Sequence, residues 1–167
     1  VDGSTCLISA MLVNNETGYI LPIEKAFPKI KRLYPECMTH CDCVQGFEKL
    51  HVSAKKLGCD ALSLSGHKIY APKGIGALYL KSGVRIKPMM LGGGQQNALR
   101  SGTEPVPLIY GMGKAVEALD STLDERFEHV REINGYARDA LGQIGAVILS
   151  KAEASPYILS IDVPGLK

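Results

Sequence analysis

The sequence predicts an α/β protein with a mixed, mostly parallel sheet and flanking helices. Residues 5–13 form a continuous apolar run, the pattern of a strand buried on both faces of a parallel sheet. Strand and helix patterns then alternate, which indicates parallel neighbouring strands joined by a crossover. A short apolar run at 76–80 follows its predecessor too closely for a crossover helix, so it is expected to return antiparallel.

A polar turn and a helix are expected after the first strand. Residues 14–18 form the turn, in which Asn15 is either a plain turn residue or a functional residue beyond a strand end. The apolar spacing predicts a helix over 22–34, and Pro28 should kink it or delay its start. Residues 38–44 then form the second strand.

One lysine follows the third strand, which is expected at 59–65. The polar break at 65–68 carries this lysine, Lys68, directly beyond the strand end. Most lysines are exposed, and burial of an unpaired ammonium is costly. Lys68 is therefore either a solvent-exposed loop residue or an amine that condenses with an aldehyde, either a carbonyl substrate or pyridoxal phosphate.

A long irregular segment and two helices follow the sheet. Residues 87–103 show no regular pattern over a length that compact domains rarely tolerate, so this loop is expected to be functional or covered by a partner. A helix is predicted over 107–119. The next helix is expected to begin with a capping box, since Ser121 and Asp124 have the required spacing.

The second of these helices has the strongest apolar stripe of the chain. Its spacing of three and four residues is typical of a core-facing helix, so the stripe is interpreted as core and not as a cofactor surface. Strands are expected after it at 146–150 and 157–163. The stripe consists of Leu123, Phe127, Val130, Ala137, Leu141 and Ile144.

Composition restricts the classes of function. The 167 residues are 46% hydrophobic and 22% charged, which is ordinary for a globular protein with a real core. A net charge of +2 gives no electrostatic footprint for nucleic acid, so no direct nucleic-acid binding is expected. No apolar run approaches the length of a membrane span, and the start does not resemble a signal peptide. A cytoplasmic protein without membrane contact is expected.

Five cysteines form an odd set that suits a reducing compartment. Because Cys37, His40, Cys41 and Cys43 lie close in sequence, a zinc site must be considered. Side chains alternate along a strand, so Cys41 and Cys43 share one face while His40 and Asp42 share the other. Convergence of four ligands is thereby disfavoured, and we expect no metal site but small apolar side chains on a packed face.

The pattern suggests two parts of a longer polypeptide. The chain begins almost directly with a buried-type strand, and its last strand lacks a partner helix. The character of the sequence changes near Leu119. We therefore expect residues 1–119 to belong to a large domain and residues 120–167 to begin a smaller, incomplete α+β domain.

Several separate motifs follow one another in a specific order along essentially the whole chain. They are Val13 to Gly18, His40 to Gln45, Ser65 to Lys68, Pro72 to Tyr79, Gly92 to Gln95 and Arg100 to Thr103. Together these motifs resemble the cysteine desulfurases, and the similarity is greatest to their NifS/IscS branch. These are pyridoxal-phosphate enzymes of fold type I in the class V aminotransferase superfamily.

The resemblance implies a role for each residue around the cofactor ring. Lys68 would be the catalytic Schiff-base lysine, which later moves protons at the substrate's alpha carbon. Asp42 would face the pyridine nitrogen and keep it protonated, so that the ring withdraws electrons. Gln45 and Asn15 would lie near the phenolic oxygen and orient it.

The resemblance also implies a phosphate site and a dimer. Ser65 and His67 would hold the cofactor phosphate together with backbone amides. Thr103 would reach the phosphate bound by a neighbouring subunit, since members of the family are homodimers with shared active sites. This role would explain the long loop at 87–103.

The implied reaction converts L-cysteine to L-alanine and transfers sulfur as an enzyme persulfide. The sulfur would serve iron–sulfur cluster assembly or tRNA thiolation through an acceptor protein such as a cluster scaffold. The loop bearing the catalytic cysteine is absent from the 167 residues, so the isolated chain is expected to be inactive. Alternatives are a selenocysteine lyase, another class V pyridoxal-phosphate enzyme, and a non-catalytic scaffold or dimerisation fragment.

Overall fold

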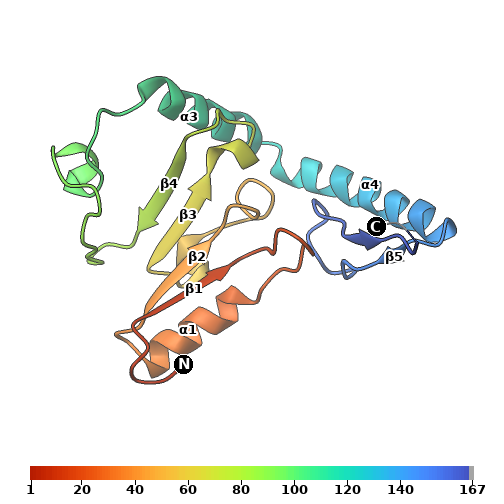
Figure 1. The fold of residues 1–167 in the computed structure, drawn as a ribbon, viewed down its shortest axis with the longest axis horizontal. Coiled ribbons are helices and arrows are strands. Elements are labelled where there is room, and N and C mark those ends of the chain that lie inside the picture. The colour runs from red at the N-terminus through yellow and green to blue at the C-terminus, as the bar shows by residue number, and fades with distance from the viewer. Residues whose placement is uncertain (166–167) are drawn as a thin grey trace.

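The computed structural model describes residues 1–165, which form a four-stranded sheet, a two-stranded sheet and helices beside them (Figure 1). The α/β class expected from the sequence is confirmed. The elements are β1 (Leu7–Met11), α1 (Ile23–Leu33), β2 (Met38–Asp42), α2 (Ala54–Leu57), β3 (Ala61–Ser65), η1 (Gly66–Lys68), β4 (Gly76–Leu80), η2 (Gln95–Ala98), α3 (Val106–Asp120), α4 (Leu123–Gln143), β5 (Val147–Ile148) and β6 (Ile161–Asp162).

The larger sheet has the order β1-β2-β3-β4. β1, β2 and β3 are parallel, and β4 returns antiparallel to β3 with the bounds that the sequence predicts. The first three strands are shorter than the apolar runs that contain them, because those runs extend into irregular backbone beyond the strand ends. Register places Met11 opposite Asp42, and Asp42 opposite Ser63. The carboxyl ends of three strands therefore meet at one edge.

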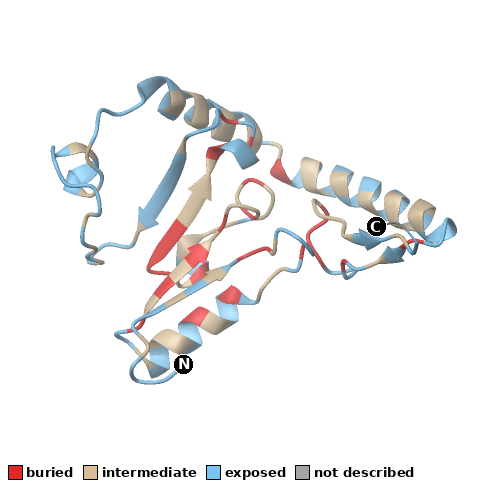
Figure 2. Ribbon diagram, in the orientation of Figure 1, coloured by how far each residue is buried: buried red, intermediate tan, exposed pale blue. Residues whose placement is uncertain are grey.

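The hydrophobic core lies between α1 and one face of the sheet. Ile23, Phe27 and Ile30 have helical spacing and face the strands, where Phe27 is 1% exposed. Burial of such a side chain stabilises the fold by roughly 2 kcal/mol. Figure 2 shows the buried segments on β2, β3 and α1. The buried cluster contains Leu12, Val13, Ile23, Phe27, Cys41, Cys43, Leu57, Cys59 and Leu62.

Pro28 lies inside α1, which nevertheless begins at Ile23. The expected delay of the helix start is therefore wrong. The buried side chains of Ile23 and Phe27 together outweigh the roughly 3 kcal/mol that an interior proline costs. The proline ring also packs against Gly58, the left-handed C-cap of α2, where an added Cβ would lie 3.0 Å from the ring.

β1 is not buried on both faces in the described residues. Ile8 and Ala10 pack against the core, whereas Leu7 is 56% and Met11 36% exposed. The expectation of two covered faces is wrong for residues 1–165, because α1 covers only one face of the sheet. The second face carries Met11, His40, Asp42 and the serines of β3, which makes it more polar than the core face.

A short break separates α3 from α4. The predicted capping box of Ser121 and Asp124 is wrong, since α4 begins at Leu123 without a side-chain cap. Instead, the guanidinium of Arg126 bonds to the carbonyl of Leu119 at 2.9 Å and to Thr122 Oγ1 at 3.1 Å. The same side chain donates to the carbonyl of Glu48 at 3.0 Å and so ties the break to the loop after β2.

The apolar stripe of α4 packs against the segment that follows it, but only in part. Leu123 is buried, while Ile144 at the far end is 73% exposed, so the expected core role fails there. Phe127 lies 6.4 Å from the Tyr157 ring, between centroids. β5 and β6 are antiparallel and shorter than the strands expected at 146–150 and 157–163, because most of the remaining residues of both runs have irregular backbone.

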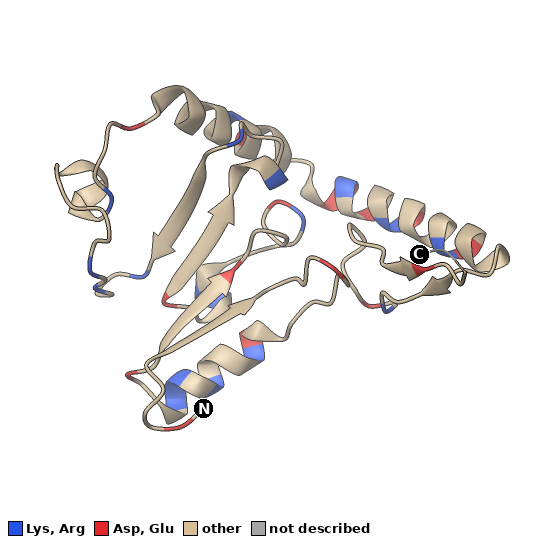
Figure 3. Cartoon of the chain, viewed as in Figure 1, with Lys and Arg blue, Asp and Glu red and all other residues tan. Residues whose placement is uncertain are grey.

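The connection between β4 and α3 is mostly irregular, as predicted for 87–103, and contains the short η2 turn. Met89 and Leu91 on it are 98% and 82% exposed. Charges of both signs lie along α1 and α4 (Figure 3). Among residues 1–165, no helix is both long and apolar enough to cross a membrane, and no cluster of three or more His, Cys, Asp or Glu side chains suits a metal ion.

Candidate active site

The candidate site lies where β1, β2 and β3 end. Ligands of parallel sheets commonly bind beyond the carboxyl ends of the strands, where loops supply polar groups. The strand ends are held together by backbone hydrogen bonds from Leu12 N to the carbonyl of Asp42 at 2.8 Å and from Cys43 N to the carbonyl of Ser63 at 3.0 Å. The edge therefore has a fixed backbone frame.

The turn after β1 is built by Asn14 and presents Asn15. The Asn14 Oδ1 accepts bonds from the backbone N–H of Glu16 at 3.0 Å and of Thr17 at 2.9 Å. Gly18 closes the turn with a φ of 74°, and its N–H bonds to the carbonyl of Asn14 at 2.9 Å. Asn15 itself is exposed beside the strand end. Its side chain is thus available to a ligand, while Asn14 is used by the turn.

Side chains on β2 divide between the two faces as the alternation predicts. Cys41 and Cys43 are buried on the core side, with their sulfurs 3.5 Å apart. On the other face, the His40 ring lies between two hydroxyls, with Nδ1 2.7 Å from Ser9 Oγ and Nε2 3.2 Å from Ser63 Oγ. His40 therefore links β1, β2 and β3 one step behind the carboxyl edge.

Asp42 and Gln45 lie at the end of β2 and in the turn that follows. Asp42 is half-buried, and its Oδ1 accepts the backbone N–H of Val44 at 2.9 Å. The half-buried Gln45 accepts a bond from Lys49 Nζ to its Oε1 at 3.0 Å. Burial, and secondly the positive charge of Lys68, lowers the pKa of Lys49. The charge on the turn after β3 therefore acts on a side chain of the turn after β2.

The turn after β3 holds three of the predicted residues. Ser65 Oγ lies 2.7 Å from His67 Nδ1, and both His67 and Lys68 are exposed. Gly66 is buried, and its N–H bonds to the carbonyl of Ile75 at 2.9 Å. An added Cβ on Gly66 would lie 2.8 Å from Ile75 Cγ2, so only glycine fits this turn without a shift of its neighbours.

Thr103 does not join this group within one chain. It is exposed in the connection between β4 and α3, which arches away from the sheet (Figure 1). The implied contact of Thr103 with the site of a neighbouring subunit stays a prediction. The structure thus gathers Asp42, Gln45, Ser65 and Lys68 at one edge.

The donor set at this edge fits pyridoxal phosphate chemically. That cofactor carries an aldehyde, a basic ring nitrogen, an acidic phenolic oxygen and a phosphate. The edge offers an exposed amine from Lys68, a carboxylate from Asp42, a carboxamide from Gln45 and a hydroxyl–imidazole pair from Ser65 and His67. Within residues 1–165, the hydrogen bonds of the Asp42 carboxylate engage Oδ1, which leaves Oδ2 for a ring nitrogen.

Sequence reasoning missed the contributions of Asn14 and Lys49. An asparagine followed by a glycine four residues later is typical of a side-chain-stabilised turn, so the role of Asn14 had a usable signal. No local sequence signal indicated the role of Lys49, because its contact with Gln45 depends on a turn in which Glu48 takes a φ of 56°. A positive φ at a glutamate is not predictable from local sequence.

Comparisons with known proteins agree with this geometry. A family model described as Aminotransferase class-V matches residues 1–167. The chain is 44% identical over 138 residues to a cysteine desulfurase IscS of Ehrlichia chaffeensis, covering 80% of this chain and 33% of that relative. These matches confirm the resemblance that the motifs predict.

Solved structures give the same result. A structure titled NIFS-like protein superposes with a TM-score of 0.96 at 39% identity, covering 99% of this chain and 46% of its own. One titled SspA in complex with cysteine superposes with a TM-score of 0.67 at 43% identity over 71% of this chain and 34% of its own. The chain thus spans about a third to a half of the length of these relatives.

Proposed function

Because the chain belongs to the aminotransferase class-V family, we propose that the protein carrying it is a pyridoxal-phosphate-dependent cysteine desulfurase. Its reaction would convert L-cysteine and an enzyme thiol to L-alanine and an enzyme persulfide, which passes sulfur to iron–sulfur cluster or tRNA thiolation pathways. The observation that carries the proposal is the grouping of Lys68, Asp42 and Gln45 at one sheet edge. The relative named cysteine desulfurase IscS supports the substrate assignment, as does the cysteine complex of SspA.

The residues of this edge would divide the work around the bound cofactor. Pyridoxal phosphate would supply an aldehyde for the substrate amine and a ring that withdraws electrons from the alpha carbon. Asp42 would hold a proton on the ring nitrogen, while Gln45 and Asn15 would donate to the phenolic oxygen. Lys68 would anchor the cofactor through Nζ and then move a proton at the substrate's alpha carbon.

The phosphate would lie against the turn after β3. The Ser65 hydroxyl and the His67 imidazole are already paired at 2.7 Å, and both can donate to phosphate oxygens. We propose that Thr103 adds a donor to the phosphate of a second subunit, which makes the protein a homodimer with shared active sites. The exposed position of Thr103 on the long connection supports this arrangement.

The sulfur-accepting cysteine would come from a part of the protein outside the 167 residues. Cys37, Cys41, Cys43 and Cys59 are buried, and Cys6 precedes β1 at the opposite edge of the sheet. None of them is therefore placed to take sulfur from a substrate at the carboxyl edge. The free thiols of these five residues also support the proposed cytoplasmic location.

We propose in addition that residues 1–119 belong to the large cofactor domain and that residues 120–167 begin the smaller one. The break between α3 and α4 and the separate β5–β6 sheet support this division. Residues 166–167 of the second part lie outside the described residues.

The proposed acceptor of sulfur is a separate protein such as an iron–sulfur scaffold.

Cofactor attachment is tested by pyridoxal phosphate addition, borohydride reduction and peptide mass mapping. Stoichiometric label on Lys68 is expected, and it should disappear in Lys68→Ala while Lys73→Ala, a neighbouring exposed lysine, keeps it. Label scattered over surface lysines, in both the chain and the full-length protein, would contradict the cofactor assignment.

The reaction is tested in a full-length protein that carries this chain. Alanine and protein-bound persulfide should appear in equal amounts from L-cysteine. Activity with selenocysteine alone would favour the lyase alternative. Cofactor binding without either reaction would favour another class V activity, and a protein that binds no cofactor would match the scaffold alternative.

A further inference from the structure

Lys49 extends from the turn after β2 toward the candidate site. The turn is closed by hydrogen bonds from Phe47 N to the carbonyl of Cys43 at 2.8 Å and from Lys49 N to the carbonyl of Gly46 at 3.1 Å. Because of this turn, the Lys49 ammonium lies beside Gln45, four residues earlier in the chain, and its Nζ is 3.0 Å from Gln45 Oε1. The same ammonium lies 5.9 Å from the centroid of the Tyr157 ring.

The surroundings of Lys49 are unusual for a lysine. The side chain is half-buried, yet within the described residues it has no carboxylate within ion-pair distance, unlike Lys31, which meets Asp60 at 2.9 Å. Burial, followed by the positive charge of Lys68, lowers the pKa of Lys49. Lys49 thus has a carboxamide and an aromatic ring as partners, while the positive charge of Lys68 acts on it without a carboxylate to offset it.

The contact with Lys49 decides which end of the Gln45 carboxamide faces the site. A carboxamide presents an acceptor oxygen at one end and a donor NH₂ at the other, and the two ends exchange by rotation. An ammonium has only donors, so it binds the oxygen. The NH₂ group of Gln45 is then the end left for a ligand, and it suits an acceptor such as an ionised phenolic oxygen.

We propose that Lys49 is a positioning residue that fixes the Gln45 carboxamide with its NH₂ group toward the phenolic oxygen of the cofactor. This inference rests on the proposed function, because Gln45 acquires its role only when that cofactor binds. It adds to the proposed site a residue that touches neither cofactor nor substrate. Lys49 also joins the site to Tyr157, in the segment after α4.

The test uses the full-length protein loaded with pyridoxal phosphate. Lys49→Met removes the donor at similar length, Lys49→Arg retains a donor, and Gln45→Ala removes the group that Lys49 holds. Lys114→Met is a matched control, because Lys114 Nζ also lies 5.9 Å from a tyrosine ring centroid, that of Tyr110, but on an exposed helix surface.

Two properties of the bound cofactor are measured, namely its release rate and the pH midpoint of its visible absorbance change. Lys49→Met should speed release about three- to tenfold, the effect of one hydrogen bond. The midpoint should move to higher pH, because a phenolic oxygen that loses its donor holds a proton more strongly. Lys49→Arg should restore both values, and Lys114→Met should change neither.

A double-mutant comparison separates positioning from general stability. If Lys49 acts through Gln45, Lys49→Met has no further effect on release or on the midpoint in the Gln45→Ala background. An equal effect in both backgrounds, or an unchanged midpoint in Lys49→Met, would overturn the inference. Failure of the unmutated protein to bind the cofactor would instead overturn the proposed function.

Discussion

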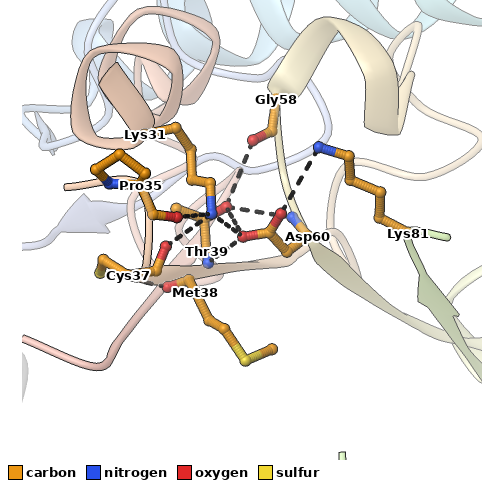
Figure 4. A network of polar contacts seen from close by, with 8 residues as sticks. All are labelled: Lys31, Pro35, Cys37, Met38, Thr39, Gly58, Asp60 and Lys81. Atoms are coloured by element: carbon orange, nitrogen blue, oxygen red, sulfur yellow. Dashed lines mark hydrogen bonds and ion pairs between the residues drawn. The ribbon is translucent and has the colours of Figure 1, made fainter. Parts of the chain in front are cut away.

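Asp42 and Asp60 stand near opposite ends of the parallel strands, in contrasting surroundings. Asp60 is 4% exposed, and its Oδ2 accepts bonds from Lys31 Nζ at 2.9 Å and from the Thr39 backbone N–H at 3.1 Å (Figure 4). Asp42 is half-buried and accepts one backbone N–H through Oδ1. The Asp60 carboxylate at the amino edge is therefore satisfied by the chain itself, whereas the hydrogen bonds of Asp42 at the carboxyl edge engage only Oδ1 within residues 1–165.

The electrostatics of the amino edge explain why it is closed. Burial alone would raise the pKa of Asp60, but the hydrogen bonds from Lys31 and Thr39 together lower it. Lys31 also donates to the carbonyl of Pro35 at 2.8 Å, and Lys81 lies 3.9 Å from the other carboxylate oxygen. We therefore expect the amino edge to contribute mainly to stability and the carboxyl edge mainly to the proposed cofactor binding, which can be tested one residue at a time.

Asp60→Asn should have the largest effect on stability. It leaves the Lys31 ammonium, 28% exposed, without its carboxylate, and loss of one partner of a buried pair costs about 3 kcal/mol. Asp42→Asn should lower the free energy of unfolding by less than about 1 kcal/mol, because Asp42 is half-buried and forms no ion pair within residues 1–165.

The measurements are urea unfolding of the two variants and pyridoxal phosphate affinity in the full-length protein. Asp42→Asn should weaken cofactor binding about tenfold or more, because a hydrogen bond to a charged group is lost, while Asp60→Asn should leave the affinity of the folded fraction unchanged. If both substitutions reduced stability equally, the separation of the two edges would be wrong.

Gly66→Ala should reduce stability by about 2 kcal/mol, the range for a side chain forced into a packed turn. The new Cβ would lie 2.8 Å from Ile75 Cγ2 and 3.1 Å from Ala71 Cβ. Gly113→Ala is the control, since nothing lies within 4 Å of its added Cβ in α3, and it should stabilise the helix by up to about 1 kcal/mol. Thermal unfolding of both variants distinguishes a steric effect from a general one; a tolerated Gly66→Ala would mean that the turn is not tightly packed.

Patterns with a local physical cause were predictable from the sequence. The strand bounds of β4 follow from its apolar run and its preceding turn, and the division of Cys41 and Asp42 between two faces follows from strand alternation. The position of Lys68 beyond β3 was likewise predicted. Each of these depends on residues close together in the chain.

Features that depend on distant contacts were not predictable. The start of α4 is set by the contacts of Arg126 with Leu119 and with Glu48, which is 78 residues earlier, so the local capping signal failed. The exposed outer face of β1 depends on what covers the sheet, which an apolar run cannot reveal. The exposure of Lys68 was not predictable for the same reason, because the residues that could cover its side chain do not belong to its own segment.

Acid pH should affect stability through Asp60 at the amino edge. Because the pKa of Asp60 is lower in the folded state, its stabilising contribution is complete above the unfolded value of about 3.9 and is lost as pH falls through the folded value. The free energy of unfolding should therefore decrease with acidification in that range, by less than the effect of Asp60→Asn. The free energy of unfolding should change less steeply with pH in Asp60→Asn than in the unmutated chain. An identical pH dependence in both would exclude Asp60 as the cause.

Ser9→Ala should have the smallest effect, because it removes one partly solvated contact on the open face. The His40 ring would lose its 2.7 Å partner on β1 but keep Ser63 on β3, so about 0.5 kcal/mol of unfolding free energy should be lost. Ser4→Ala is the control and should be silent, because the exposed Ser4 hydroxyl donates to Asp2 Oδ1 at 2.7 Å, two residues away in the chain. Cofactor affinity should change less than about twofold, since β1 is held to β2 along its whole length by backbone pairing. A loss as large as that of Asp60→Asn would contradict this prediction, because the sheet face that α1 does not cover would then contribute as much stability as the amino edge.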